Sequence, residues 1–480
     1  MPAKERPQKM NPVAATPGPC LLSAFSMGGS RERVIGMRIK RRAFLKTALA
    51  AGAATVIPDA WSQIPDDAWN KTWDAALATL AGNVKPVPHF DQPVLYEGSV
   101  YRGTWLECGP HESLAYAQLG DLVPPIDGKP TPLEVARNTH RAFFVNQRED
   151  GQLPYNVHVT GLHWGQIQMV VPIAATAWDV SRMLKDEAFL TEAYNACGRW
   201  DDWLMRYRNT RGTGLVEAFC TWDTGQDNSP RWAGVSNACP DEDATKCPKG
   251  ESVPRLCPDL SATVFGGRVA LSAMATALGK QAEAQKWTDA AEHIRALILK
   301  KLWCEEDASF YDIAPDNTFV RVRSVANCRV PAEHVMRLDV SHERKIFNTL
   351  WERQLHNPKA FWAQYPLPSI AMDDPKFVRP IPRNSWGGAS QALTALRTLR
   401  WMDYYGKATD LHWMMERWCE AILRLGKFDQ QVNPDTGEFT QWDPGGYSPC
   451  ALVFLHFAKR LGHAPSPRAQ EALPDRLSTA

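Results

Sequence analysis

The segment with the clearest chemical potential is residues 221–232, which read Thr-Trp-Asp-Thr-Gly-Gln-Asp-Asn-Ser-Pro-Arg-Trp. It places two carboxylates, Asp223 and Asp227, among tryptophan, asparagine and arginine side chains. Cleavage of a glycosidic bond needs a carboxylic acid that protonates the leaving oxygen and a second carboxylate across the sugar. An apolar wall such as Trp222 raises the pKa of an acid by desolvation, which keeps it protonated near neutral pH. The same residues also suit a capped turn before a helix, so the segment alone leaves both interpretations open.

The elements that must position this segment are predicted to be helices. Apolar residues recur every three or four positions from Trp287 to Leu302 and from Leu411 to Leu425, which gives each segment one apolar stripe. Alternating strand patterns are few and lie chiefly around 94–108. Further helices are expected over 68–82, 132–147, 166–183, 187–208, 260–279, 341–354, 388–405 and 447–461.

Short turns join these helices in pairs, and this arrangement favours an all-α fold of repeated α-hairpins in a ring over a simple bundle. In such a scaffold the long loops collect at one end and carry the chemistry. The long loops expected here are 98–131, 148–165, 209–259, 356–387 and 427–446.

The segment 222–232 resembles the acid-bearing loop of glycoside hydrolase family 63 and its trehalase relatives. In that family the run is close to Trp-Asp-Ser-Gly-Met-Asp-Asn-Ser-Pro-Arg-Trp. The similarity covers roughly residues 95–462 and implies a six-hairpin (α/α) toroid and an inverting mechanism. Four further runs resemble family motifs in the same order, at 148–154, 259–312, 365–387 and 433–438.

Position by position, Asp227 matches the general acid of the family. Arg383, Asn384 and Trp386 match a family run of arginine, glycine and a following tryptophan only in part. Arg102 and Trp105 fall in an early loop that is expected to close the −1 subsite. The resemblance and the tryptophan wall together give a candidate substrate-binding set of Arg102, Trp105, Trp222, Asn228, Arg231, Trp232, Arg383, Asn384, Trp386 and Gln430.

The catalytic base departs from the family pattern. The family has a glutamate about four residues before the proline of the final loop, and this chain has Gln430 there. A neutral amide cannot deprotonate water, although it can orient it. Three readings stay open: Glu438 activates the water, the adjacent Asp429 does so, or the chain has no orthodox base and is a weakened hydrolase or a sugar-binding relic.

Composition narrows the range of partners. The 480 residues carry 54 Lys and Arg against 53 Asp and Glu, so there is no basic surplus to neutralise nucleic-acid phosphates. The sequence shows no phosphate loop, nucleotide fingerprint or other cofactor motif, and no cofactor is expected. It lacks a Cys-x-x-Cys or paired-histidine spacing, which argues against a zinc site. The acidic run 241–243 lacks the alternating ligands of a calcium loop and reads as a solvated loop.

The N-terminus has the pattern of a twin-arginine export signal. Residues 40–46 read Lys-Arg-Arg-Ala-Phe-Leu-Lys and precede a modest apolar stretch over 47–57. That stretch is shorter than the roughly 20 apolar residues of a membrane-spanning helix. Met37 is the expected start, and the mature protein is expected in the periplasm or outside the cell, exported by the twin-arginine machinery.

The expected organisation is an N-terminal extension and signal peptide over 1–60, a glycosidase domain over 61–465 and a flexible tail over 466–480. Ten cysteines follow the signal, and an even number in an exported chain permits disulfides. One pair is plausible among Cys239, Cys247 and Cys257.

Taken together, the sequence predicts an exported, inverting glycosidase that acts on a small α-linked glycoside or oligosaccharide. A related glycosidase with a different sugar specificity is a second interpretation. A non-catalytic sugar-binding toroid is a third, and it is motivated by Gln430.

Overall fold

The computed structural model describes residues 65–383, 386–440 and 445–465. They belong to one compact unit that runs from Asp59 to Ala480. The predicted signal at 1–60 and the predicted tail at 466–480 lie outside the described residues. No helix in the described part of the chain is long and apolar enough to cross a membrane.

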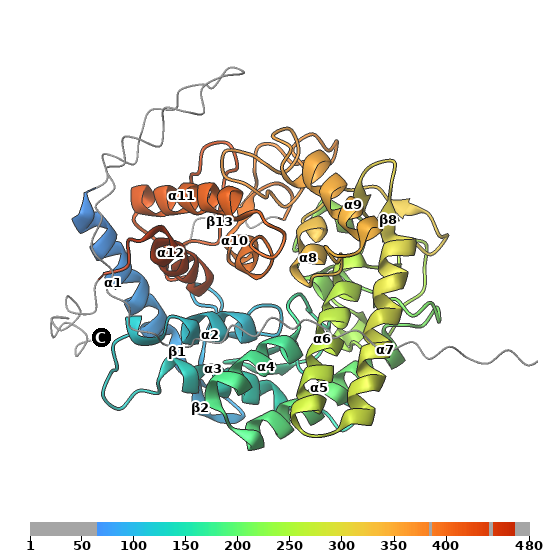
Figure 1. Cartoon of the computed structure of the whole chain (residues 1–480), viewed down its shortest axis with the longest axis horizontal. Helices are drawn as coiled ribbons and strands as arrows, with labels where there is room; N and C mark the ends of the chain where they lie inside the picture. Colours follow the sequence, from blue (N-terminus) through green and yellow to red (C-terminus); the bar gives the residue numbers. More distant parts are fainter. Residues whose placement is uncertain (1–64, 384–385, 441–444, 466–480) are drawn as a thin grey trace, which may run out of the picture. The chain divides into compact units, whose positions relative to one another are not determined.

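Helices dominate this unit, as the periodicity predicts (Figure 1). The helix α3 begins with a capping box, in which Thr131 and Glu134 bond each other's backbone N–H, and α11 ends at Gly426 with a φ of 66°. The helices are α1 (Asp66–Asn83), α2 (Gly109–Gln118), α3 (Pro132–Phe144), α4 (Ile173–Leu184), α5 (Glu187–Tyr207), α6 (Pro258–Ala277), α7 (Gln281–Leu297), α8 (Ala326–Ala332), α9 (Ser341–Leu350), α10 (Ala392–Arg397), α11 (Ala408–Leu425) and α12 (Ser448–Leu461).

The sequence prediction missed two of these helices. The helix α2 lies inside the segment 98–131 that was expected to be a loop, and α8 was not predicted at all. Every residue from Gly109 to Ala117 is buried. A helix that is buried on all sides has no apolar stripe facing a polar one, so periodicity does not reveal it. The expected helix at 388–405 is also shorter than predicted, since α10 covers only Ala392–Arg397.

Short antiparallel sheets join the helices, and an all-α description omits them. The sheet order is β1-β2, β3-β4-β5, β11-β10-β7-β6, β8-β9 and β12-β13. The strands are β1 (Val84–Val87), β2 (Phe90–Leu95), β3 (Gly103–Trp105), β4 (Asn156–His158), β5 (Gly161–His163), β6 (Glu217–Ala218), β7 (Arg255–Leu256), β8 (Trp303–Cys304), β9 (Ser309–Phe310), β10 (Asp312–Ile313), β11 (Phe319–Val320), β12 (Ser390–Gln391) and β13 (Gln431–Val432).

The even-numbered helices pack on one another in chain order. The helix α2 contacts α4, α4 contacts α6, and α6 contacts α8. The helix α10 contacts α12, and α12, the last helix of the described part, also contacts α2. The odd-numbered helices cover this series from the other side, with α3 on α2, α5 on α4, α7 on α6 and α1 on α12.

Tryptophans fill much of the core between these helices. Trp73, Trp203, Trp401 and Trp418 are among the largest fully buried side chains. Large aromatic side chains supply much of the apolar area that a core removes from water, and each fully buried one stabilises the fold by roughly 2–3 kcal/mol. These four tryptophans therefore pack the core.

Candidate active site

A cavity of about 290 Å³ collects most of the polar groups that could act on a ligand. It lies among loops that follow β3, β5 and β6 and precede α10 and α12, so segments far apart in sequence meet there. Its lining residues are Glu97, Tyr101, Trp105, Glu107, Tyr155, Asn156, His158, Thr160, His163, Gln166, Gln168, Trp222, Gly225, Asp227, Trp386, Leu393 and Gln430.

The loop that carries Asp227 is anchored by its other carboxylate. Both oxygens of the fully buried Asp223 accept backbone hydrogen bonds, from Ile167 N at 2.9 Å and from Phe219 N at 2.8 Å. The guanidinium of Arg208 lies 3.6 Å from the same carboxylate. Of the two acids that the sequence places together, Asp223 therefore fixes the loop and Asp227 faces the cavity.

Gly225 lets this loop approach a second carboxylate. Its φ is 62°, in the left-handed region that favours glycine, and a Cβ at this position would lie 1.9 Å from Oε2 of Glu107. The glutamate itself receives a hydrogen bond from Nε2 of Gln168 at 3.1 Å and lies 3.4 Å from the Arg397 guanidinium. Glu107 is thus held beside the Asp227 loop by its approach to Gly225 and by its contacts with Gln168 and Arg397.

Asp227 has the electrostatics of an acid that is still partly protonated at neutral pH. Burial raises its pKa to about 7, and the negative charge of Glu107 adds to the effect. Its backbone carbonyl accepts a hydrogen bond from Trp386 N at 3.1 Å, which ties the acid loop to the segment before α10. A carboxyl group whose pKa is raised close to neutral pH is suited to acid–base chemistry.

A third carboxyl group, Glu97, also lines the cavity. It is buried, and burial together with the nearby charges of Glu112 and Glu107 raises its pKa well above the usual range. The Tyr447 hydroxyl donates to its Oε1 at 2.8 Å. This raised pKa disfavours the ionised form of Glu97, which argues against Glu97 as the base that takes a proton from water.

Gln430 reaches the cavity from the strand pair β12-β13. Gln391 pairs with Gln431 in this ladder, and the carbonyl of Gln430 accepts a hydrogen bond from Ala392 N at 2.9 Å. The Tyr101 hydroxyl lies 3.1 Å from Oε1 of Gln430. An amide and a phenol are therefore fixed side by side on the wall that also carries Trp386.

The three-stranded sheet β3-β4-β5 supplies a polar rim. Asn156 lies opposite Trp105 across the β3-β4 pair, and its Oδ1 is 2.7 Å from Nδ1 of His163. His158 sits edge-on to the Trp105 ring, with ring centroids 5.7 Å apart. Burial, and then the charges of His163 and Arg102, lower the pKa of His158. This rim can hydrogen-bond the hydroxyl groups of a ligand.

Five of the residues predicted from sequence line this one cavity. They are the expected acid and four members of the expected substrate-binding set. Trp105 and Trp222 are partly exposed there, and Trp386 is buried. The five residues are Trp105, Trp222, Asp227, Trp386 and Gln430.

Two predicted contacts of substrate, Arg231 and Trp232, are instead buried behind the loop. Arg231 is 2 % exposed and bonds both oxygens of Asp259 and both of Asp312, at distances from 2.5 to 2.8 Å. Trp232 stacks against this guanidinium and donates to Thr224 Oγ1 at 2.9 Å. The Arg231 guanidinium, paired with two carboxylates, therefore has a structural role in the core. Neither Arg231 nor Trp232 is among the described residues that line the cavity.

Other predicted substrate contacts lie on the surface. Arg102, Asn228 and Arg383 are exposed and are absent from the described lining of the cavity. Polar side chains next to the loop that carries Asp227 therefore do not all line the described cavity. Asn384 lies outside the described residues.

The two carboxylates offered as bases also lie outside the described lining of the cavity. Glu438 is exposed, and its backbone carbonyl closes a turn with Asn433 N at 2.8 Å. Asp429 is fully buried, pairs with Lys427 at 3.1 Å and accepts from Gln430 N at 2.8 Å. The structure brings the neutral Gln430, and neither of these acids, to the cavity wall.

The sequence analysis missed Glu97, Tyr101 and Glu107. A usable signal was present, because Glu97, Tyr101 and Glu107 all lie at even spacing from Trp105 within the expected strand segment 94–108. Residues at even spacing point to the same face of a strand. The sequence did not reveal that Tyr447 and Gln430, which come from distant segments, bond Glu97 and Tyr101.

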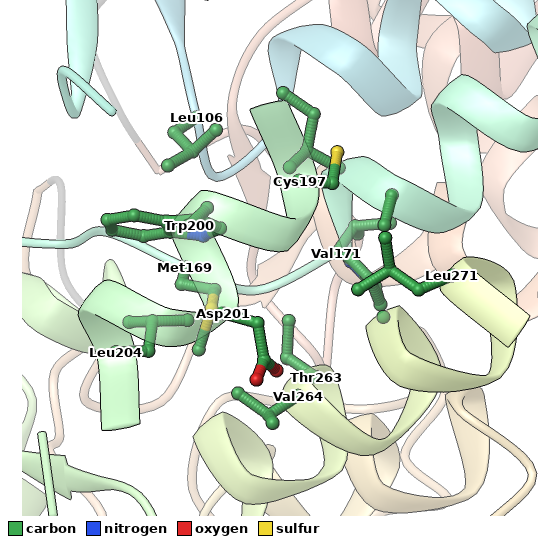
Figure 2. Close-up of a pocket in the computed structure, with 14 residues that line it drawn as sticks. Leu106, Met169, Val171, Cys197, Trp200, Asp201, Leu204, Thr263, Val264 and Leu271 are labelled. Atoms are coloured by element: carbon green, nitrogen blue, oxygen red, sulfur yellow. The ribbon is translucent and has the colours of Figure 1, made fainter. Parts of the chain in front are cut away.

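A second cavity, between α5 and α6, is only about 30 Å³ and is lined mostly by apolar side chains such as Leu106, Met169 and Leu271 (Figure 2). Asp201 at its edge is paired with Arg268 at 2.9 Å. A space of that size holds about one or two waters. It is a packing gap in the core, too small for a sugar.

The likeness to known proteins agrees with this geometry. Residues 131–449 match the model of the mannosylglycerate hydrolase MGH1-like glycoside hydrolase domain, which is more than half of the chain. The chain belongs to this family of glycosidases. The family match includes the acid loop, Trp386 and Gln430.

Individual relatives are more distant. An 80-residue stretch is 31% identical to the glucosylglycerate hydrolase of Mycolicibacterium hassiacum, but it covers only 16% of this chain and 18% of that protein. A crystal structure of the family 63 mannosylglycerate hydrolase of Thermus thermophilus superposes with a TM-score of 0.61 at 19% identity, covering 81% of this chain and 100% of that one. The neutral trehalase of Saccharomyces cerevisiae superposes with a TM-score of 0.56 at 13% identity over 84% of each chain. The two structural matches establish likeness of fold alone.

Proposed function

We propose that this protein hydrolyses a small α-linked glycoside and that Asp227 protonates the departing oxygen. The observation that carries the proposal is the position of Asp227 in the polar cavity, with its pKa raised to about 7. An acid with that pKa is partly protonated at neutral pH and can still give up its proton, which is what a general acid requires. The cavity volume of about 290 Å³ suits a sugar with a small aglycone.

In the proposed mechanism, Glu107 keeps Asp227 protonated through its charge and accepts hydrogen bonds from sugar hydroxyls. Trp105, Trp222 and Trp386 pack against the apolar faces of the ring. Gln430 and Tyr101 position the attacking water. Because the amide of Gln430 cannot remove a proton, turnover is expected to be slower than that of a homologue with a glutamate there, by about 10²–10⁴-fold.

The substrate class follows from the relatives and the cavity together. The matched relatives are named for hydrolysis of mannosylglycerate and glucosylglycerate. We therefore propose a glucosyl or mannosyl unit linked to a short polar acid or alcohol as substrate. The family resemblance predicts inversion at the anomeric carbon, which proton NMR of the first-formed product anomer measures directly.

The deciding experiment compares wild type with Asp227→Asn on glucosylglycerate, mannosylglycerate and a panel of aryl α-glycosides. Hydrolysis by wild type and its loss in Asp227→Asn support the proposal. Asp429→Asn and Glu438→Gln should retain activity, since neither side chain lines the described cavity. Loss of activity in Glu438→Gln, in a protein that still folds and binds sugar, would instead assign the base to that residue.

Gln430 also supports a second function, that of a non-catalytic sugar-binding protein. In that case wild type and Asp227→Asn would be equally inactive on every glycoside, and both would bind sugar in calorimetry. The two functions therefore separate in a single set of assays.

The six-hairpin toroid is part of the same proposal. It is supported by the packing of α2, α4, α6 and α8 in chain order and by the contacts of α12 with both α10 and α2. A crystal structure in which α8 and α10 are not neighbours, so that the series of helices does not close into a ring, would argue against it.

Export by the twin-arginine route is supported by residues 40–46 and by no structural observation. Cell fractionation tests it, because replacing Arg41 and Arg42 by lysine should retain the protein in the cytoplasm. Periplasmic appearance of that double variant would assign export to another signal.

A further inference from the structure

Three cysteines gather beneath the loop that carries the proposed acid. Cys220 and Cys239 are fully buried and form a small apolar cluster with Phe219, against which the partly buried Cys247 packs. The thiols of Cys220 and Cys239 and the carboxylate of Asp223 lie within 4.8 Å of one another. None of these thiols takes part in the proposed hydrolysis.

The backbone already holds the two chain segments together. Thr221 N donates to Ser236 O at 2.9 Å, and Trp222 N donates to Asn237 O at 3.0 Å. These bonds lie immediately after Cys220 and immediately before Cys239. An S–S bond is about 2.05 Å long, so the two free thiols, which lie within 4.8 Å of each other, must move closer to be joined, while the backbone bonds already hold their chain segments side by side.

The surroundings argue against a metal ion at this cluster. Arg208 points its guanidinium into it, 3.8 Å from the Cys239 sulfur and 3.6 Å from the Cys247 sulfur. A buried cation there repels a second one. The Asp223 oxygens are already bonded to two backbone N–H groups.

Burial raises the pKa of the Cys247 thiol, and the Arg208 guanidinium offsets part of that rise by favouring the thiolate, which is the species that reacts in disulfide exchange. Cys247 is the member of the cluster that solvent reaches. Its thiol also donates to the carbonyl of Tyr207 at 3.1 Å. An oxidant therefore meets the cluster at Cys247, and exchange can pass inward to Cys239.

We propose that Cys220 and Cys239 form a disulfide that closes the loop carrying Asp227. The oxidant is a small-molecule disulfide such as oxidised glutathione. Cys247 attacks it, forms a mixed disulfide and releases one glutathione thiol. Cys239 then attacks the Cys247 sulfur and displaces the other glutathione, and Cys220 attacks the Cys239 sulfur and displaces Cys247. Two protein thiols thus lose two hydrogens and the oxidant gains them. Cys247 ends as a free thiol.

The bond constrains residues 221–238, which hold Asp223, Gly225 and Asp227. A cross-link stabilises the folded state mainly by restricting the unfolded chain. Here it also limits local opening of the loop that presents the acid.

Peptide mapping tests the pairing directly. The purified protein is oxidised with oxidised glutathione, alkylated without reduction and digested with trypsin. Cleavage after Arg211, Arg231 and Lys246 puts the three cysteines on separate peptides, 212–231, 232–246 and 247–249. A linked pair of 212–231 with 232–246, together with an alkylated 247–249 peptide, is the expected result. A link between 232–246 and 247–249, or alkylation of all three, overturns the proposal, as does stoichiometric zinc in the purified protein.

Variants test the consequence for the loop. Dithiothreitol should lower the thermal midpoint of the oxidised wild type and leave Cys220→Ser and Cys239→Ser unaffected. Cys197→Ser, a buried cysteine on α5, is the matched control and should respond to dithiothreitol as wild type does. If the wild type shows no redox-dependent midpoint, the proposed cross-link is absent, and the peptide map decides this even if a serine variant does not fold.

Discussion

Changing Gln430 to glutamate places a carboxylate on the cavity wall at the position where the family resemblance expects the base. Gln430 lines the cavity together with Asp227, and Tyr101 lies 3.1 Å from its Oε1. The two side chains have nearly the same shape, so the change adds a proton acceptor with little disturbance of packing. We expect Gln430→Glu to hydrolyse the substrate faster than wild type.

The size of the gain follows from the surroundings of the side chain. General-base catalysis contributes about 10²–10⁴-fold. Gln430 is 4 % exposed and shares the cavity with Glu97 and Glu107, so burial and nearby carboxyl groups would raise the pKa of the introduced acid and leave part of it protonated. The Tyr101 hydroxyl can donate to the carboxylate and offset part of that shift. Because part of the introduced acid stays protonated, we expect the lower end of the 10²–10⁴-fold range. The kcat should therefore rise by about 100-fold, which corresponds to about 2.7 kcal/mol of transition-state stabilisation.

Initial rates on glucosylglycerate and mannosylglycerate measure this gain. The double variant Gln430→Glu with Asp227→Asn is the matched control, because a gain that comes from the proposed mechanism must depend on the acid. Adding azide gives a second measurement. Azide is a small anion that attacks the sugar without needing a base, so it should accelerate the reaction of wild type and have little effect on Gln430→Glu.

A Gln430→Glu protein that folds, binds sugar as wild type does and hydrolyses no faster would refute this reasoning. It would mean that water is activated elsewhere or that the cavity does not hold a scissile bond. A gain that persists in the double variant would refute the role of Asp227 instead.

Three further outcomes follow from the contacts. The kcat/KM of wild type should fall as pH rises through about 7, because Asp227 then loses the proton it must donate. Glu107→Gln removes the charge that adds to the effect of burial on this pKa, so the fall should begin at lower pH. A pH profile that does not move in this variant would contradict the coupling of the two carboxyl groups. Gly225→Ala should lower the free energy of unfolding by about 1–3 kcal/mol in urea titration, because the φ of this residue is 62° and the new Cβ would clash with Glu107. An unchanged urea midpoint would contradict the close approach of Gly225 to Glu107. Arg231→Met should cost about 3–5 kcal/mol in the same titration, because it removes the buried cation that bonds both Asp259 and Asp312 and leaves Asp259 with its 3.2 Å pair to Arg329. A stable protein that only loses sugar affinity would restore the predicted substrate contact.

Local signals in the sequence account for much of this protein. The stripes from Trp287 to Leu302 and from Leu411 to Leu425 predicted helices that the structure contains, because one side of each packs on the core. The order of residues around Asp227, with the other motifs, was sufficient to recognise the family and to predict which loop carries the acid. These features are local, since periodicity and short motifs are written in neighbouring residues.

What the tertiary structure decided depends on contacts between distant segments. The helix α2 is buried on all sides by its neighbours, which removed the pattern that reveals a helix. Arg231 stands beside the acid in sequence but turns to Asp259 and Asp312, because a buried guanidinium must be paired. Glu107 comes to lie against Gly225 only through folding, and its charge is what helps to raise the pKa of Asp227. The sequence by itself determined the family and pointed to Asp227, whereas the burial and the neighbouring charge that set the pKa of this carboxyl group exist only where separate loops meet.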